Sequence, residues 1–171
     1  MDNDLKLMLA SLDEGGKSVK KISVKHYWCG GAQGSENDWV NPANWYNRNV
    51  PGWFDEVVIS GDYYLPCHYP QIDIFANDIA QLIIEKGGEL VIGEHGKLSI
   101  DGMGKKGIGI LNEGEVRIYG ELTIQRTTYA CIRNFGQICN TGSLALDKNG
   151  KRSILQKKDG SFLNFGELIY L

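Results

Sequence analysis

Two histidines and two cysteines carry the side chains from which a metal centre could be built. His26 and Cys29 form a His-x-x-Cys pair, and Cys67 and His68 are adjacent. Tetrahedral zinc takes these ligand types, but the two pairs lie too far apart for zinc-finger spacing. Adjacent residues of a strand also point to opposite faces. We therefore predict no metal and no other cofactor, and we retain His26, Cys29, Cys67 and His68 as the alternative, a zinc site.

The chain has four cysteines, Cys29, Cys67, Cys131 and Cys139, which would allow two disulfides in a secreted protein. Residues 1–16 lack the features of a secretory signal peptide, because two aspartates precede the first lysine and the apolar run is short. For a chain without a signal we expect a cytoplasmic protein with reduced thiols. For a chain whose signal was removed, we expect a cell-surface or secreted protein with disulfides. A catalytic cysteine needs an adjacent base, and no local pattern predicts one.

Acid–base chemistry on polysaccharides is a third possibility, because parallel β-helices often carry it. Glycoside hydrolysis requires two carboxylates about 5–9.5 Å apart. The candidate carboxylates are scattered singly: Asp73, Asp78, Glu85, Asp101 and Glu115. We therefore expect a mostly solvated acidic surface, and we keep a small polysaccharide-active or effector enzyme as one hypothesis.

An aromatic segment, residues 27–69, contains all four tryptophans of the chain. Aromatic rings can stack on the apolar faces of sugars. The candidate ligand-binding residues are Trp39, Trp45, Trp53, Tyr63 and Tyr64. The structural alternative, which we favour, is that the tryptophans plug the N-terminal end of a hydrophobic core.

The same segment carries a motif that resembles the opening module of right-handed parallel β-helix proteins on bacterial surfaces, especially those of Bacteroidetes. The matching residues are Tyr27, Gly30, Asp38, Trp39, Pro42, Asn44, Trp45, Val50, Pro51, Asp55, Val57, Ile59, Pro70 and Ile72. The aromatic start is offset by one residue, and Asn49 replaces the usual glycine before Val-Pro. The resemblance covers about residues 25–171. It implies a right-handed β-helix in a group of mostly adhesin-like or uncharacterised proteins, and it implies no particular activity.

After this segment the sequence repeats itself, in residues 82–100, 110–124, 132–146 and 157–171. Two sets of glycines align at intervals of 22–26 residues: Gly88, Gly114, Gly136 and Gly160, then Gly96, Gly120, Gly142 and Gly166. An aliphatic set follows the second glycine: Leu98, Leu122, Leu144 and Leu168. A period of this length with alternating strands and no helical stretch is typical of a β-solenoid.

The repeats predict two short strands per coil, parallel stacking of coils and columns of like aliphatic residues in the core. We expect the glycines at turns, where positive φ is easily adopted. Asn112 and Asn134 form one candidate asparagine column. Asn140 and Asn164 form another, either as a hydrogen-bonded ladder or through a shifted strand boundary.

Composition excludes several classes. The 171 residues carry a net charge of −3, which provides no general basic field for nucleic acid, and no apolar run is long enough to cross a membrane. A local basic cluster, including Lys157 and Lys158, is either a solvated flank or a patch for an anionic partner. The expected organisation is an N-terminal capping helix and lead-in strand in 1–24, an aromatic cap and first coil in 25–79, and solenoid coils in 80–171.

The sequence thus predicts an all-β, short right-handed parallel β-helix with an N-terminal capping helix. The leading hypothesis for function is a non-catalytic interaction or adhesion module that binds protein or carbohydrate. A second hypothesis is a self-assembling scaffold, a homo-oligomer that stacks through its last coil. The candidate interface residues for stacking are Phe162, Phe165, Tyr170 and Leu171.

Overall fold

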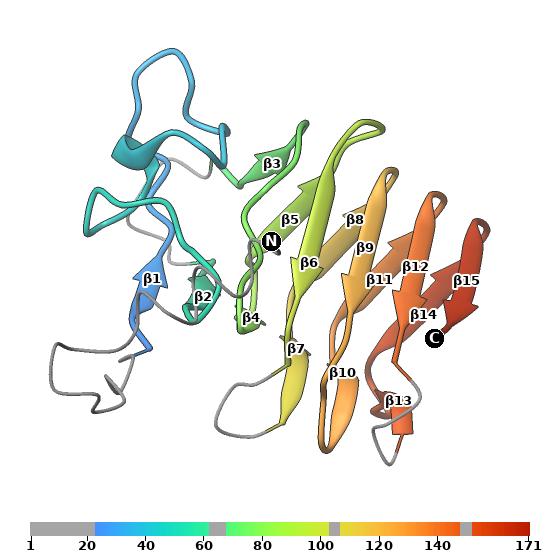
Figure 1. The fold of residues 1–171 in the computed structure, drawn as a ribbon. Helices are drawn as coiled ribbons and strands as arrows, with labels where there is room; N and C mark the ends of the chain where they lie inside the picture. Colours follow the sequence, from blue (N-terminus) through green and yellow to red (C-terminus); the bar gives the residue numbers. More distant parts are fainter. Residues whose placement is uncertain (1–22, 62–67, 103–106, 148–151) are drawn as a thin grey trace, which may run out of the picture.

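The computed structural model describes residues 23–61, 68–102, 107–147 and 152–171. This part of the chain is an all-β parallel solenoid of about four turns (Figure 1). Its one helical element is a 3-10 turn, η1 (Pro42–Asn44). The capping helix predicted within 1–24 falls on residues 1–22, which lie outside the described residues.

Each turn of the solenoid contributes one strand to each of three sheets. The first sheet contains β1 (Lys25–Tyr27), β2 (Glu56–Ile59), β4 (Gln81–Ile84), β7 (Ile108–Asn112), β10 (Ala130–Asn134) and β13 (Arg152–Gln156). The second contains β3 (Gln71–Ile72), β5 (Glu89–Ile92), β8 (Glu115–Ile118), β11 (Gln137–Asn140) and β14 (Ser161–Asn164). The third contains β6 (Lys97–Ile100), β9 (Glu121–Ile124), β12 (Ser143–Leu146) and β15 (Glu167–Tyr170).

The prediction of two strands per coil was wrong, because the structure has three. The second and third strands alternate clearly between apolar and polar residues, as in β9 with its burial of Leu122 and Ile124. The first strand does not, since β4 contains the consecutive apolar residues Leu82, Ile83 and Ile84. Without period-2 alternation, this strand cannot be separated by pattern from the segment that follows it.

The core consists of aliphatic columns that run through the coils, as the repeats predicted. Leu98, Leu122, Leu144 and Leu168 are in register across the third sheet. Leu90, Val116, Ile138 and Phe162 are in register across the second. Like residues stacked at a constant strand spacing bury their side chains against the coil before and the coil after, which is how repeat proteins gain stability.

The aligned glycines lie at the corners between sheets, but positive φ is not the reason for them. The described glycines with positive φ are Gly30, Gly34, Gly87, Gly102 and Gly107, and none belongs to the aligned sets. Instead, a Cβ on an aligned glycine would collide with backbone of the preceding coil. For Gly120, Gly142 and Gly166 the colliding atom is the carbonyl oxygen of the aligned glycine one coil earlier. The corner requires glycine because two backbones touch there.

Both asparagine columns form hydrogen-bonded ladders. The side-chain amide of Asn112 donates to Asn134 Oδ1 at 2.7 Å, and Asn134 donates to Gln156 Oε1 at 3.1 Å. In the second column Asn140 donates to Asn164 Oδ1 at 2.6 Å. The strand register pairs Asn140 with Ile118 in the coil before, so no boundary is shifted. Amides can replace aliphatic side chains here because each bonds to its neighbour along the solenoid axis.

Three tryptophans close the N-terminal end of the core. Trp28, Trp39 and Trp45 are each less than one-tenth exposed, and the ring of Trp45 meets the other two edge to face at about 5 Å. The segment around Asp38 pairs with Gln71 of β3, which covers that edge strand of the second sheet. This end of the solenoid is therefore plugged, as the structural alternative for the tryptophans predicted.

The corner packing predicts a large difference between two glycine substitutions. We expect Gly142→Ala to lower the free energy of unfolding by about 1–3 kcal/mol, because its methyl group overpacks the backbone of Tyr119 and Gly120. Gly52→Ala is the matched control, since a Cβ there meets only Asp55 at 3.8 Å, and we expect a change within about 0.5 kcal/mol. Chemical denaturation measures both. Equal stability of the two variants would contradict the close corner contact.

Candidate interaction surface at the open end of the solenoid

The last turn of the solenoid lacks the burial that its columns have in every earlier turn. Ile100, Ile124 and Leu146 are 0% exposed, whereas Tyr170, the next residue of that column, is 46% exposed. The other columns behave alike, since Phe162 and Leu168 are only partly buried. The change follows from position, because no described strand lies beyond β13, β14 and β15 (Figure 1).

We call this surface the C-terminal face. Its apolar side chains are Phe162, Leu163, Phe165, Leu168, Ile169, Tyr170 and Leu171. Phe165 is the most exposed large hydrophobic residue among those described, at 74%. Contiguous exposed apolar surface of this kind marks interaction sites in soluble proteins.

The structure brings together the four predicted interface residues, Phe162, Phe165, Tyr170 and Leu171, in the last turn. It adds Leu163 and Ile169, which sequence reasoning missed. Strand alternation places both on the outer side of their sheets, where single apolar residues are unremarkable. They join the exposed column residues in one apolar surface only because no further turn covers the last one.

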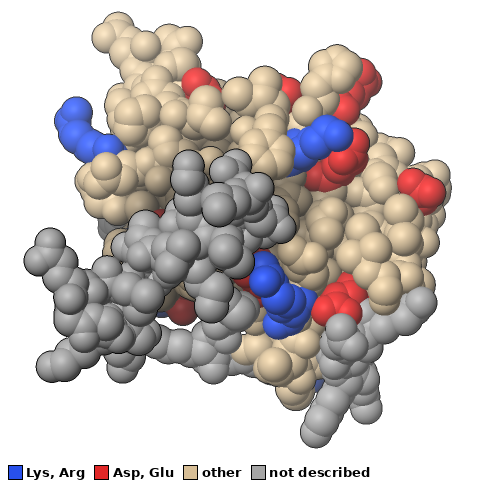
Figure 2. Space-filling view, viewed as in Figure 1, with Lys and Arg blue, Asp and Glu red and all other residues tan. Residues whose placement is uncertain are grey.

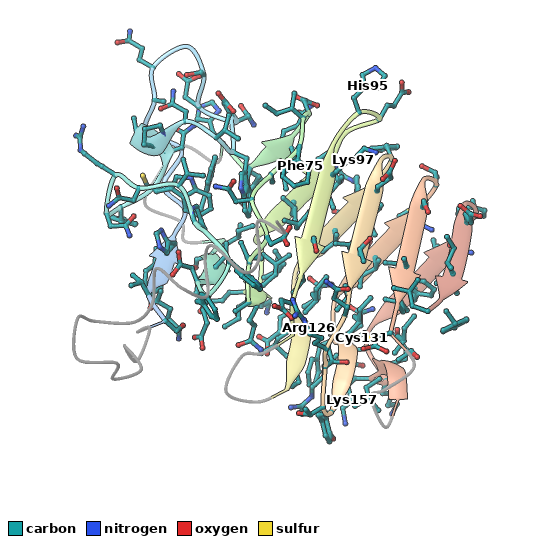
Figure 3. All side chains as sticks on the ribbon, viewed as in Figure 1. Phe75, His95, Lys97, Arg126, Cys131 and Lys157 are labelled. Atoms are coloured by element: carbon teal, nitrogen blue, oxygen red, sulfur yellow. The ribbon has the colours of Figure 1, made fainter. Side chains whose placement is uncertain are left out.

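The backbone of the last turn can form hydrogen bonds with a partner. In the inner turns, the strands β7 to β12 each bond to a parallel strand on both sides. In β13, β14 and β15 one side of each strand faces outward from the last turn, so its amides and carbonyls can accept a further strand. Charged side chains flank these strands: Lys157 and Lys158 follow β13, and Glu167 begins β15. The ammonium of Lys157 lies 6.0 Å from the centre of the Phe135 ring (Figure 3).

The proposed sugar-stacking role for Trp39 and Trp45 does not fit the structure. Each is 1% exposed, and their rings pack against one another, so neither offers a face to a ligand. Tyr63 and Tyr64 lie outside the described residues. The motif residues beside the tryptophans are also structural. Asn44 is fully buried and bonds to the backbone of Ala32, Ser35 and Asp38.

Trp53, the remaining aromatic candidate, belongs to a polar cluster at the third corner of the solenoid. Its indole nitrogen donates to Asp101 Oδ2 at 2.5 Å, and Arg126 forms a bidentate ion pair with the same carboxylate. The backbone amide of Arg126 donates to Asp147 of the next coil at 2.9 Å. Asp101 is 1% exposed, so the cluster joins successive coils and leaves little of this carboxylate accessible.

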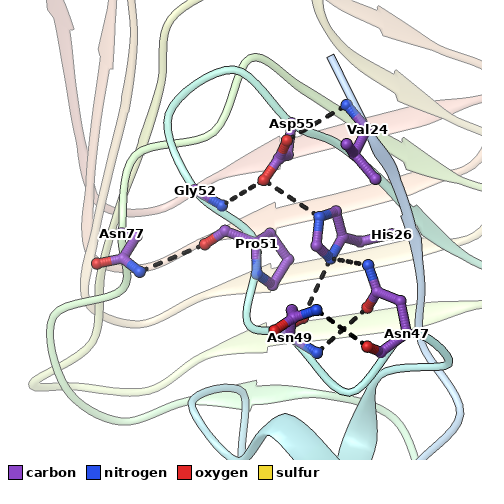
Figure 4. Close-up of polar contacts among 8 residues, drawn as sticks. All are labelled: Val24, His26, Asn47, Asn49, Pro51, Gly52, Asp55 and Asn77. Atoms are coloured by element: carbon purple, nitrogen blue, oxygen red, sulfur yellow. Dashed lines mark hydrogen bonds and ion pairs between the residues drawn. The ribbon is translucent and has the colours of Figure 1, made fainter. Parts of the chain in front are cut away.

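The metal candidates are not assembled into a site. His26 is 4% exposed, and both of its ring nitrogens have protein partners (Figure 4). Nδ1 lies 3.1 Å from Asn49 O and from Asn47 Nδ2, and Nε2 lies 3.1 Å from Asp55 Oδ2. Cys67 lies outside the described residues. Across the described ranges, no group of three or more histidines, cysteines and acidic residues is positioned to hold a metal ion.

Three cysteines, Cys29, Cys131 and Cys139, are free thiols. Cys131, labelled in Figure 3, is fully buried close to Thr127, whose hydroxyl lies 3.4 Å from its sulfur. Burial raises the pKa of the Cys131 thiol, although bonds to Thr127 and to the carbonyl of Asp147 oppose this. A raised pKa makes it a poorer nucleophile at neutral pH.

The five candidate carboxylates are distributed over different corners and faces. Glu85 follows β4, Asp101 follows β6, and Glu115 lies on the outer side of β8, where it contacts Arg117. In Figure 2, acidic and basic side chains are likewise dispersed among uncharged residues on the visible face. Asp73 lines the cleft described next, away from those three carboxylates in the sequence and on a different strand end.

A cleft of about 500 Å³ opens between residues 34–40 and residues 71–74. Its carboxylates belong to Glu36, Asp38 and Asp73, and a hydrogen bond from the Gly34 amide lowers the pKa of Glu36. Trp39 also lines the cleft, and its buried indole nitrogen has no hydrogen-bond partner among the described residues. Sequence analysis named Asp73 as a candidate carboxylate and Trp39 as a candidate ligand-binding residue, but it did not predict that they line one cleft with Glu36 and Asp38.

Comparison with known proteins leaves the function to be argued from geometry. No protein-family model, no curated protein and no solved structure matches this chain. None of the helical structure in the described ranges is long and apolar enough to cross a membrane.

The thiols differ in accessibility, which predicts an order of modification. With iodoacetamide at pH 8, we expect Cys139 to react at least tenfold faster than Cys131, because Cys139 is partly exposed on the outer side of β11 and Cys131 is buried with a raised pKa. Peptide mass spectrometry after timed quenching measures both rates. Unfolded protein in guanidinium is the control, where the rates should converge. Faster labelling of Cys131 in the folded protein would contradict its burial.

Proposed function

We propose that this chain is a non-catalytic interaction module that binds another protein through its C-terminal face. The observation that supports the proposal is the loss of burial at the last residue of each core column, from 0% exposure at Leu146 to 46% at Tyr170. Aromatic side chains surrounded by other apolar groups are the usual anchors of protein interfaces.

The proposed mode of binding is the addition of strands to the last turn. Main-chain hydrogen bonds to β13, β14 and β15 would supply affinity, and side chains inserted over Phe162, Leu168 and Tyr170 would supply specificity. The resemblance of residues 25–171 to bacterial surface β-helix proteins supports an adhesin-like setting. A right-handed coil is part of this proposal, because about 98% of parallel crossover connections have that hand.

Site-specific photo-crosslinking in the native host tests the proposal. We expect p-benzoylphenylalanine at position 165 to form covalent adducts with a protein, because Phe165 lies in the last turn and is 74% exposed. Tyr119 is the matched control position, since both residues follow a strand of the second sheet and donate their backbone amide to the coil before.

We expect position 119 to give fewer than about one-tenth of the adducts formed at position 165. Comparable adducts at both positions, or none at position 165, would overturn the proposal. The identity of the attached protein shows whether the partner at this face is a different protein or a second copy of this chain.

Carbohydrate binding at the acidic cleft is the second candidate function. The cleft combines carboxylate acceptors with the exposed apolar residues Ile74 and Phe75 next to it, at 58% and 64% exposure. Phe75 lies beside β6 (Figure 3). Sugar hydroxyls donate well to carboxylates, and sugar ring faces pack on apolar side chains.

A neutral-glycan array tests this second candidate. We expect any bound glycan to lose about tenfold or more in affinity with Asp73→Ala, because hydrogen bonds to charged groups contribute about 1.5–3 kcal/mol. Glu121→Gln, on the wall of the third sheet, is the control and should bind as the parent does. A glycan that binds equally to Asp73→Ala, or an array without binding, would exclude the cleft as a sugar site.

A further inference from the structure

We infer that the C-terminal face fits a second copy of this chain, in a closed two-fold pair joined end to end. The inference rests on the proposed function, because it names the partner of the same face. Three features of the molecule support it: the unlike ends of the solenoid, the symmetry of the last turn and the charges at its corners.

The two ends cannot stack on each other as successive coils do. At the N-terminal end, the tryptophan cluster fills the core, and the segment around Asp38 covers β3. Isolated bridges from Phe75 and Ile79 lie against β6. These segments break the three-strand pattern that the last turn would need to continue. Continuation of all three sheets from the last turn of one molecule into the first turn of the next is therefore disfavoured. A contact between two C-terminal faces avoids this mismatch.

A two-fold axis perpendicular to the solenoid axis produces such a contact. It places the two last turns face to face with their chains running around the solenoid in opposite senses, so the facing strands of the two copies would pair antiparallel. When the axis crosses β14 at a right angle, β14 pairs with β14 of the second copy. In the same arrangement, β13 of each copy pairs with β15 of the other. The three strands contain five, four and four residues, so the lengths match. Such an isologous contact closes on itself and leaves no free edge on the last turns.

Charge favours this position of the axis. It brings the end of β13 opposite the start of β15 in the second copy. Lys157 and Lys158 then lie near Glu167 of the other molecule, and the symmetry makes the contact twice. An axis through the face of β15 would instead place the lysine corner against itself, where like charges repel. All three side chains are exposed in the single molecule, so they are accessible to a partner.

Sedimentation velocity of the purified chain between 1 and 200 µM, at low salt, tests the inference. We expect a reversible dimer that does not grow into larger species. Phe165→Ser should weaken dimerisation by about a hundredfold, since each dimer loses two buried aromatic anchors. Tyr119→Ser, at the equivalent corner of an inner turn, should leave it unchanged. Circular dichroism confirms that each variant is folded.

Charge reversal tests the arrangement itself. We expect Glu167→Lys, and separately Lys157→Glu with Lys158→Glu, to weaken the dimer about five- to thirtyfold each. The combined variant should recover most of the parent affinity, because opposite charges meet again. Recovery would be unexpected if these residues acted only on the stability of one molecule.

Three results would overturn the inference: a monomer at every concentration, a series of species larger than the dimer, or a combined charge variant that is weaker than both partial ones. A monomer that still forms adducts with a foreign protein through position 165 overturns the closed pair and leaves the proposed function standing. A dimer that forms no adducts at position 165, either with its own copy or with another protein, places the contact elsewhere and overturns both.

Discussion

Backbone contact at the corners is the constraint on which the rest of this structure depends. Parallel strands of successive coils must stay within hydrogen-bonding distance in three sheets at once, so the chain between sheets has to turn within the same spacing. At two of the corners this brings backbone onto backbone, and glycine is the residue that leaves room for it. The period of 22–26 residues, the columns of aliphatic residues and the amide ladders all follow from that fixed spacing.

The same constraint makes the ends of the molecule chemically special. A coil inside the stack satisfies its backbone and buries its inner side chains through its two neighbours, and an end coil has only one. The N-terminal end solves this with three large aromatic rings, of which two donate their indole nitrogen to backbone: Trp28 to His68 and Trp45 to Trp39. The last turn has no comparable plug among the described residues. Its strands and core columns are therefore available to a partner, whereas those of the inner turns are not.

Several residues whose types suggest chemistry turn out to hold the fold together. His26 orders the turn around Asn47 and Asn49, and Asp101 joins coils through Trp53 and Arg126. Buried polar groups need partners, and in a thin solenoid with a largely aliphatic core the corners are where partners can be supplied. Cys131 is a further example, because its burial raises the pKa of the thiol that a nucleophile would need lowered.

The sequence by itself determined the solenoid, its period and the aliphatic columns of the second and third sheets, because these depend on contacts between residues one coil apart that the repeats display directly. It predicted both asparagine columns, but it left a ladder and a shifted boundary open for Asn140 and Asn164. It also placed four residues of the C-terminal face. Tertiary structure alone decided the number of strands per coil, since the apolar run Leu82–Ile84 hides a strand from its pattern. It decided too between the two roles predicted for Trp39 and Trp45, which are buried against one another and present no platform to a ligand. Burial of these rings depends on segments distant in the sequence, and no local pattern records that.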